Sequence, residues 1–321
     1  MKEIKTINTN NIQNLDSIRN GEKIILSNSM ISEFKTCERK FVFSYVLNKD
    51  IDEDYIQPKY FAFGNAFHEI MEEINHDPMK FTVEILNRVS DKHGLDPVYE
   101  KSKLVQCVNL YLKEAPKSGL NVIATEVYFK NKNAGTVDAI GVDKDNNWWI
   151  IDLKTAASLS SLRVEMLSVD SQMALYANHA EDIKNAVEAL LNIKLGDFLG
   201  IRLREVTKAK ERKKKVEETF EQFYDRLSPI EYRELILKKE YIETEEVRFY
   251  MEVESERAND TVKRYIESGE NIKCVPRNVR KCNDPITKEI CPFFKTCHGK
   301  SAREILKQEV ELKSLSELLD F

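Results

Sequence analysis

The chain has 321 residues, with 49 Lys and Arg against 54 Asp and Glu, which gives a formal net charge of −5. This balance disfavours a protein that coats nucleic acid by bulk positive charge, but it allows a local basic groove or a metal-bridged phosphate contact. The 42% hydrophobic content excludes global disorder, and the combination of 10 Gly with 32% charged residues favours a helix-rich fold.

The sequence shows no sign of membrane insertion or secretion. No apolar run approaches the ~20 residues that span a bilayer, and the polar N-terminal segment lacks the apolar stretch of a signal peptide. We therefore expect a cytoplasmic protein with no membrane contact. Disulfides are unexpected in that reducing compartment, so the six cysteines need another explanation, and four of them lie between residues 274 and 297.

The predicted elements describe one mixed α/β core with added helices. In chain order we expect a mobile arm over 1–26, a helix after Ser27, helices over 61–74, about 79–93 and about 97–116, strands over 122–130, 135–142 and 148–153, a helix from 168 to about 180, a strand over 198–206, and helical structure from 208 to about 270. Ser27 with Glu33 downstream is typical of a helix N-cap. The three consecutive strands predict a meander.

Two of these strands carry a pattern of charged side chains that can bind a metal ion. The strand over 148–153 leads into Asp152-Leu-Lys154, and residues two apart share one face of a strand. Asp138 interrupts the preceding apolar strand, so adjacent pairing would bring it near Asp152. Carboxylate oxygens suit Mg²⁺ or Mn²⁺, which activate water and stabilise charge on a phosphate. The alternative is that both Asp residues merely end strands at the solvent boundary.

Three further residues are uninformative when each is considered alone. His68 lies on the predicted helix over 61–74, where a single His is more often structural than a metal ligand. Gln172 and Tyr176 are four residues apart and therefore share one helix face. Taken singly, these two would be surface or capping residues.

Considered together, four short motifs resemble the PD-(D/E)XK nuclease superfamily, and specifically its RecB-like branch. They are Gly64-x3-His68, Gly135-x2-Asp138, Asp152-x-Lys154 and Gln172-x3-Tyr176, in the order of that family. The resemblance implies a metal site formed by His68, Asp138 and Asp152, a catalytic Lys154, and DNA contacts or site support from Gln172 and Tyr176. Glu126 matches an acidic position of the family, although a solvent-facing strand residue explains it equally well.

The resemblance also implies a fold and a domain organisation. The expected fold is α/β with a mixed sheet, in which a restriction-endonuclease-like αβββαβ core carries helical insertions. After the mobile arm, we assign 27–300 to a single nuclease domain. Its parts are a helical insertion (51–118), the catalytic core (119–206), a helical region (207–273) and a cysteine segment (274–298), and a helical tail (301–321) follows.

The cysteines resemble those of an iron–sulfur subset of the same family, which includes helicase–nuclease subunits and CRISPR-associated and phage exonucleases. The resemblance implies a [4Fe–4S] cluster that joins the N- and C-terminal parts through Cys37, Cys282, Cys291 and Cys297. The tail spacing C-x8-C-x5-C departs from the common C-x2-C-x5-C, which leaves Cys274 as an alternative to Cys282. Four thiolates also suit zinc. Cys107 lies on an apolar helix face and is expected in the core.

The resemblance implies a metal-dependent DNA exonuclease that acts on single-stranded DNA or DNA ends in replication, recombination or repair, of phage or bacterial type. One alternative is a CRISPR-adaptation nuclease that trims ends. Another is a non-cleaving DNA-end-binding or structural subunit, against which the intact Asp–Asp–Lys set argues. The basic runs 208–215 and 277–281 are either solvated or contact DNA phosphates. The segment 312–321 either packs on the domain or docks a replication or recombination protein.

Overall fold

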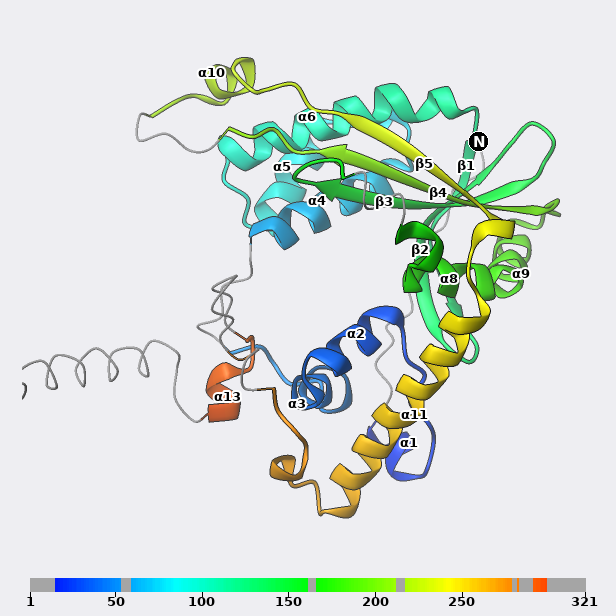
Figure 1. Ribbon diagram of the computed structural model, residues 1–321. Helices are drawn as coiled ribbons and strands as arrows, with labels where there is room; N and C mark the ends of the chain where they lie inside the picture. The colour runs from blue at the N-terminus through cyan, green and yellow to red at the C-terminus, as the bar shows by residue number, and fades with distance from the viewer. Residues whose placement is uncertain are drawn as a thin grey trace, which may run out of the picture. The chain divides into compact units, whose positions relative to one another are not determined.

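The computed structural model describes residues 15–52, 59–160, 166–211, 217–278, 282 and 291–298 (Figure 1). Within this part the chain divides into two compact units. The first, called the sheet unit below, holds the described residues of 59–251. The second, called the cysteine unit, holds those before 59 and after 251. Our interpretation of 27–300 as one domain stays a prediction.

The sheet unit is built on five strands in the order β1-β2-β3-β4-β5. They are β1 (Asn121–Lys130), β2 (Ala134–Val142), β3 (Trp148–Ala156), β4 (Phe198–Thr207) and β5 (Tyr232–Lys238). β1, β2 and β3 are antiparallel neighbours, which confirms the predicted meander. β4 runs parallel to β3, and β5 antiparallel to β4. The mixed sheet confirms the α/β class.

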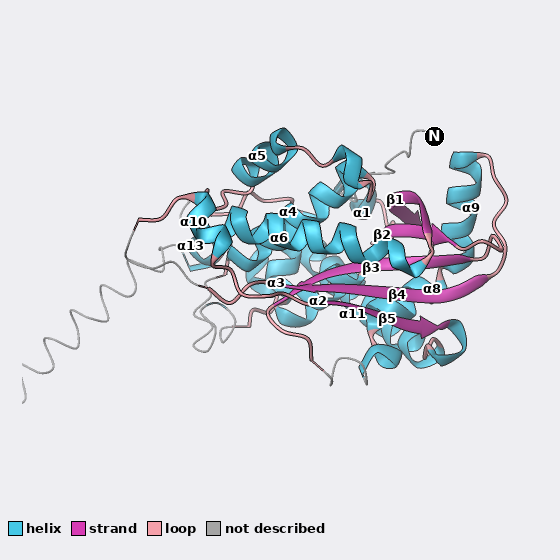
Figure 2. Ribbon diagram, turned by 90° about the horizontal axis from the view of Figure 1, so that it is seen from above, coloured by secondary structure: helices cyan, strands magenta, loops and turns pink. Residues whose placement is uncertain are grey.

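Helices pack on the sheet and bury its apolar side chains. They are α4 (Lys59–Ile74), α5 (Val83–Lys92), α6 (Tyr99–Glu114), α8 (Ser171–Asn178) and α9 (Ala180–Leu191). α4, α5 and α6 share one core with Ala139, Ile151, Leu153 and Val206 of the sheet. Figure 1 shows α6 on one side of the sheet and α8 and α9 on the other, and Figure 2 shows the strands side by side. α8 and α9 form the crossover that the parallel β3–β4 pair requires.

The structure corrects the prediction of continuous helix from 208 to about 270. β5 lies within that stretch, preceded by α10 (Phe220–Asp225) and followed by α11 (Glu245–Glu267). β5 is an edge strand whose residues are half-buried or exposed, and Arg233 pairs across the ladder with Glu205. An edge strand rich in charged residues lacks the apolar alternation that signals a strand.

The cysteine unit consists of short helices and the C-terminal part of α11. The helices are α1 (Leu15–Arg19), α2 (Asn28–Thr36), α3 (Glu38–Phe41) and α13 (Phe294–His298). The hydroxyl of Ser27 accepts the backbone N–H of Met30, so the predicted N-cap is confirmed. Within the expected mobile arm, Ile24 and Leu26 are buried, and the Ile24 N–H donates to Asn259 of α11.

Several expectations concern parts of the chain outside the described residues. These parts are residues 1–14 of the expected arm, 212–216 of the first basic run, 279–281 of the second, and the tail 301–321. Among the described residues, no helix is long and apolar enough to cross a membrane.

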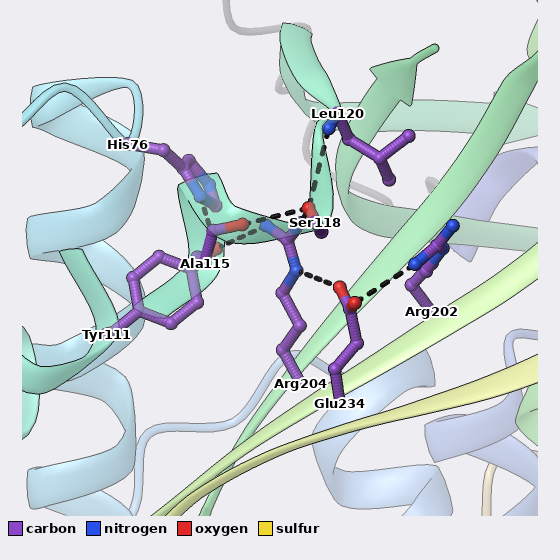
Figure 3. A network of polar contacts seen from close by, with 8 residues as sticks. All are labelled: His76, Tyr111, Ala115, Ser118, Leu120, Arg202, Arg204 and Glu234. Carbon is purple, nitrogen blue, oxygen red and sulfur yellow. Dashed lines mark hydrogen bonds and ion pairs between the residues drawn. The ribbon is translucent and has the colours of Figure 1, made fainter. Parts of the chain in front are cut away.

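A buried polar network ties β4 to β5 and α6 (Figure 3). Arg204 of β4 is 2% exposed, and its guanidinium donates to Glu234 at 2.8 Å, to the Tyr111 hydroxyl at 3.0 Å and to the Ser118 hydroxyl at 2.8 Å. Burial, with Arg204 nearby, lowers the pKa of His76 to about 3. His76 is therefore neutral at pH 7, and its Nδ1 shares a hydrogen bond of 2.6 Å with the Tyr111 hydroxyl.

We predict that Arg204→Met lowers the unfolding free energy of the sheet unit by about 3 kcal/mol, because it removes the buried guanidinium that the half-buried Glu234 carboxylate and two hydroxyls share as their donor. Urea unfolding followed by tryptophan fluorescence measures this unit selectively, since both tryptophans, Trp148 and Trp149, lie in β3. The matched control is Arg88→Met, whose surface pair with Glu73 is worth less than about 1 kcal/mol. Equal losses in the two variants would contradict this account of the network.

Candidate metal and catalytic site

The site lies where β2 and β3 separate. The two strands pair from Val142 with Trp148 as far as Ala139 with Ile151, and Asp138 and Asp152 occupy the next level. Beyond that level β2 continues on β1 and β3 continues on β4. Figure 1 shows β2 turning away from β3. The prediction that adjacent strands bring Asp138 and Asp152 to one level is confirmed.

Asp138 closes the open end of this ladder with its side chain. Its Oδ2 accepts the backbone N–H of Leu153 at 2.6 Å, and its Oδ1 lies 3.4 Å from Nδ1 of His68 on α4. The apolar residues of α4 that precede and follow His68 are buried in the core shared with the sheet. His68 itself is 29% exposed and Asp138 16%. The pair therefore borders solvent, as a ligand site requires.

Glu126 joins these two residues through an unusual backbone. β1 pairs Thr125 with Ala139 and Val127 with Val137, so Glu126 lies level with Asp138. Its φ of 48° is left-handed, which is uncommon for a residue with a side chain and is a form of local strain. His68, Glu126 and Asp138 each offer one ligand atom, and these atoms lie within 4.8 Å of one another. The sequence matched Glu126 to an acidic position, and the structure brings it to the other two.

Asp152 and Lys154 share one face of β3 and form an ion pair there. The ammonium of Lys154 donates to Oδ1 of Asp152 at 3.0 Å and lies 2.9 Å from Oδ2. Asp152 is fully buried, whereas Lys154 is 28% exposed. Oδ2 of Asp152 has this ion pair but accepts no aligned hydrogen bond from the described residues. A carboxylate oxygen in that state can also bind a metal cation.

The acidic groups perturb one another strongly. Burial, together with the charges of Asp138 and Glu72, raises the pKa of Glu126 to about 7. Burial, together with Asp138, raises the pKa of Asp152 to about 6, although Lys154 opposes the shift. Burial alone would raise the pKa of Asp138, but His68 and Lys154 outweigh it and hold that pKa below its usual value. Several carboxylates compete for little positive charge, and a divalent cation relieves such crowding.

The donor set fits a hard divalent cation. One imidazole nitrogen and two carboxylates, those of Glu126 and Asp138, meet at the open end of the β2–β3 ladder, and Asp152 lies at the same level on β3. Oxygen donors of this type suit Mg²⁺ or Mn²⁺. When bound, such an ion lowers the pKa of a water ligand and stabilises negative charge on a phosphate.

Gln172 and Tyr176 support the strand that carries Asp138. Tyr176 is buried, and its hydroxyl donates to the carbonyl of Thr136 at 2.9 Å, two residues before Asp138. The side-chain amide of Gln172 donates to the Tyr176 hydroxyl at 2.6 Å. Gly135 allows the ring of Phe129 to pack against the backbone of β2, since a Cβ at this position would lie 2.7 Å from that ring. This geometry indicates a positioning role for both motif residues.

One cavity of the sheet unit lies apart from these residues. It has a volume of about 1050 Å³ and is lined by His76, Tyr111, Arg204 and residues at the start of β1. The cavity therefore does not bear on the metal site.

The four cysteines of the predicted cluster come together in the cysteine unit. The N–H of Asn278 donates to Sγ of Cys37 at 3.5 Å, and its carbonyl oxygen lies 3.6 Å from Sγ of Cys282. The backbone N–H of Cys291 donates to the carbonyl of Cys282 at 2.9 Å. Burial, and then the charges of Cys297 and Cys37, raise the pKa of Cys282. These contacts and charge effects indicate that the four thiols lie in one region of the cysteine unit.

The remaining cysteines lie apart from this group. Cys274 is exposed, and its thiol donates to the hydroxyl of Ser268 at 3.1 Å. Cys107 is fully buried in the sheet unit, which confirms its place in the core. The geometry therefore favours Cys282 over Cys274 as the neighbour of Cys37.

The sequence did not single out Asp52, which fixes the C-terminal cysteine segment. Its carboxylate accepts the backbone N–H groups of Lys295 and Thr296 at the start of α13, at 2.6 and 3.2 Å. Its own N–H donates to the carbonyl of Pro292 at 2.9 Å. A capping Asp normally precedes its helix directly in the sequence. Asp52 caps a helix far along the chain, so only the three-dimensional contact identifies it.

The model of the PD-(D/E)XK nuclease superfamily matches residues 25–298. The chain belongs to that superfamily. Most of its members are nucleases and use divalent metals, which supports a metal-dependent hydrolytic activity for this PD-(D/E)XK domain. No curated protein sequence matches the chain.

We predict that Glu126→Gln lowers Mn²⁺ affinity by more than about tenfold, because it removes a charged ligand from the site. The variant should unfold at the same temperature as the wild type or higher, since it also removes a carboxylate that Asp138 repels. Calorimetric titration with Mn²⁺ measures the first effect. The control is Glu114→Gln on the surface of α6, and unchanged Mn²⁺ binding in Glu126→Gln would exclude Glu126 as a ligand.

Proposed function

We propose that the chain is a metal-dependent DNA exonuclease that hydrolyses phosphodiester bonds in single-stranded DNA or at DNA ends. The proposal rests on one observation: the ligand atoms of His68, Glu126 and Asp138 lie within 4.8 Å of one another in a member of a nuclease superfamily. Asp152 and Lys154 lie at the same open end of the ladder. Replication, recombination or repair of DNA is the process that we propose for it.

The residues divide the chemical work. His68, Glu126, Asp138 and Asp152 would hold the cation. Lys154 forms an ion pair with Asp152, and its partly exposed ammonium can orient an attacking water or neutralise charge that develops on the phosphate. The backbone N–H of Leu153 binds Oδ2 of Asp138, so that Oδ1 lies toward His68. Tyr176, through Thr136, holds the strand on which Asp138 lies.

A non-cleaving end-binding subunit would need none of this arrangement. The pairing of buried Asp152 with Lys154 costs desolvation energy. A chain without catalytic chemistry has no reason to retain such a pair. The complete Asp–Asp–Lys set therefore favours the enzyme. Nothing in the described residues favours an end-trimming nuclease of CRISPR adaptation over the general proposal.

We predict that Asp152→Asn and Lys154→Met each reduce cleavage by more than about a hundredfold, because each removes charge needed in the transition state. The assay uses end-labelled linear single-stranded DNA with Mn²⁺, and EDTA should abolish the activity. Lys144→Met, in the turn between β2 and β3, is the matched control and should cleave at the wild-type rate.

A covalently closed single-stranded circle tests the exonuclease mode. An exonuclease leaves the circle intact and degrades the linear strand. Digestion of the circle at the linear rate would establish an endonuclease instead, and wild-type rates in Asp152→Asn would refute the site assignment.

We further propose that Cys37, Cys282, Cys291 and Cys297 bind a [4Fe–4S] cluster with a structural role. Basic side chains near the thiols offset the negative charge of such a cluster. Arg39 donates to Sγ of Cys297 at 3.6 Å. Burial raises the pKa of Cys282 and Cys291, and the charges of Arg277 and Lys40 oppose that rise. The backbone of Val275 in turn holds the Arg39 guanidinium at 2.7 Å.

Four thiolates suit either zinc or an iron–sulfur cluster. The resemblance of the cysteines to those of the iron–sulfur subset of the family favours the cluster.

We predict that anaerobically purified protein shows a broad absorption shoulder near ~400 nm, as expected of thiolate-ligated iron–sulfur clusters. Cys282→Ser should lose this band, whereas Cys274→Ser, its matched control, should keep it. Metal analysis that finds zinc and no iron would replace the cluster with a zinc site. Loss of the band in Cys274→Ser alone would exchange the roles of these two cysteines.

A further inference from the structure

An exposed pair of aromatic side chains opens the helix that carries His68. Tyr60 is 52% exposed and Phe61 49%, and their ring centroids lie 4.4 Å apart. Exposed aromatic groups of this size are uncommon unless they bind something. The pair lies in the first turn of α4, at a place where no motif of the family falls.

The helix geometry places Phe61 on the same face of α4 as His68. Phe61 and His68 are seven residues apart, or about two turns, so they share one face of α4 at about 10.5 Å along its axis. Gly64 lies between them on that face and presents no side chain. A Cβ at Gly64 would lie 3.6 Å from the hydroxyl of Thr155, the residue after Lys154. The face of α4 that leads from His68 to Phe61 therefore runs beside the catalytic end of β3.

Positive charge lies at the catalytic end of β3. The ammonium of Lys154 is 28% exposed there, beside Asp152. Lys208 contributes none to this face, because its ammonium lies 4.2 Å from the ring centroid of Phe63, a buried residue on the other side of α4 from Phe61. A partly exposed cation beside the metal ligands suits a phosphate chain.

We infer that Tyr60 and Phe61 form a stacking platform for the bases of a single-stranded DNA end whose scissile phosphate lies at the metal site. The inference rests on the proposed nuclease function and adds its substrate form. A span of about 10.5 Å corresponds to roughly three stacked nucleotides at about 3.4 Å each. Bases of a duplex are covered by their partners, whereas those of a single strand offer faces to aromatic rings.

The test is a comparison of two double variants that each remove one Tyr and one Phe from the surface. Tyr60→Ala/Phe61→Ala removes the platform. Tyr241→Ala/Phe249→Ala is the matched control, since these side chains are 64% and 68% exposed in the same unit and lie outside α4 in the chain. Both are made in the Asp152→Asn background, and fluorescence anisotropy measures binding of a labelled single strand and a blunt hairpin duplex with Mn²⁺ present.

We expect the platform variant to bind the single strand about 10-fold more weakly or worse, because stacking is worth about 1–3 kcal/mol per base. Duplex binding and the control variant should be unchanged. In the active background, the same substitution should raise KM for the single strand and leave kcat intact, since it does not contact the metal ligands. 2-Aminopurine placed three nucleotides from the scissile bond should lose its fluorescence quenching.

Three results would overturn the inference: unchanged single-strand affinity, an equal loss for the duplex, or a lower unfolding temperature in the platform variant. The last would show that the rings pack against protein. Failure of the proposed function is distinguishable, because wild-type protein would then cleave nothing while its single-strand affinity still depended on Tyr60 and Phe61.

Discussion

The early end of the β2–β3 ladder is the constraint on which the site depends. Once the strands separate after Ala139 and Ile151, the N–H of Leu153 has no backbone partner, and leaving it unsatisfied in a buried position would cost about 1–3 kcal/mol. The carboxylate of Asp138 supplies the missing acceptor at 2.6 Å. The same side chain is therefore both a part of the sheet and a candidate ligand, and its position is fixed before any cation binds. Such preorganisation is what a hydrolytic site needs.

The parts of the strands that no longer pair with each other need other support. The free half of β2 is held by β1 on one side and by the Tyr176 hydroxyl of α8 on its Thr136 carbonyl. The free half of β3 is held by β4, whose Arg204 is anchored to β5 and α6 by charged and polar contacts. The family motifs thus contain two kinds of residue. His68, Asp138 and Asp152 lie where β2 and β3 separate, whereas Gln172, Tyr176 and Gly135 support the backbone of β2.

The sequence carried the local part of this information and not the long-range part. Two consecutive apolar strands were enough to predict that Asp138 and Asp152 lie near each other, and the observed register then places them at one level. An apolar helix face was enough to predict that Cys107 is buried. β5 escaped prediction because its charged residues find partners, such as Glu205, only on a strand about 30 residues earlier. The left-handed backbone that turns Glu126 toward His68, the cap by Asp52 and the exposed rings at the start of α4 likewise have no signature in residue type or spacing.

The proposed cluster has a consequence for stability that follows from chain order alone. Cys37 precedes the sheet unit and Cys282 follows it, so a cofactor that binds both closes a loop of 282 − 37 = 245 residues. A covalent link across a loop of that length reduces the entropy of the unfolded chain enough to contribute about 5 kcal/mol to folding. This is comparable to the whole stability of a marginal domain, about 5–15 kcal/mol. Loss of the cluster would therefore weaken the sheet unit and its metal site without altering any of its contacts. A cysteine far from the scissile phosphate can in this way govern catalysis through the population of folded protein rather than through chemistry.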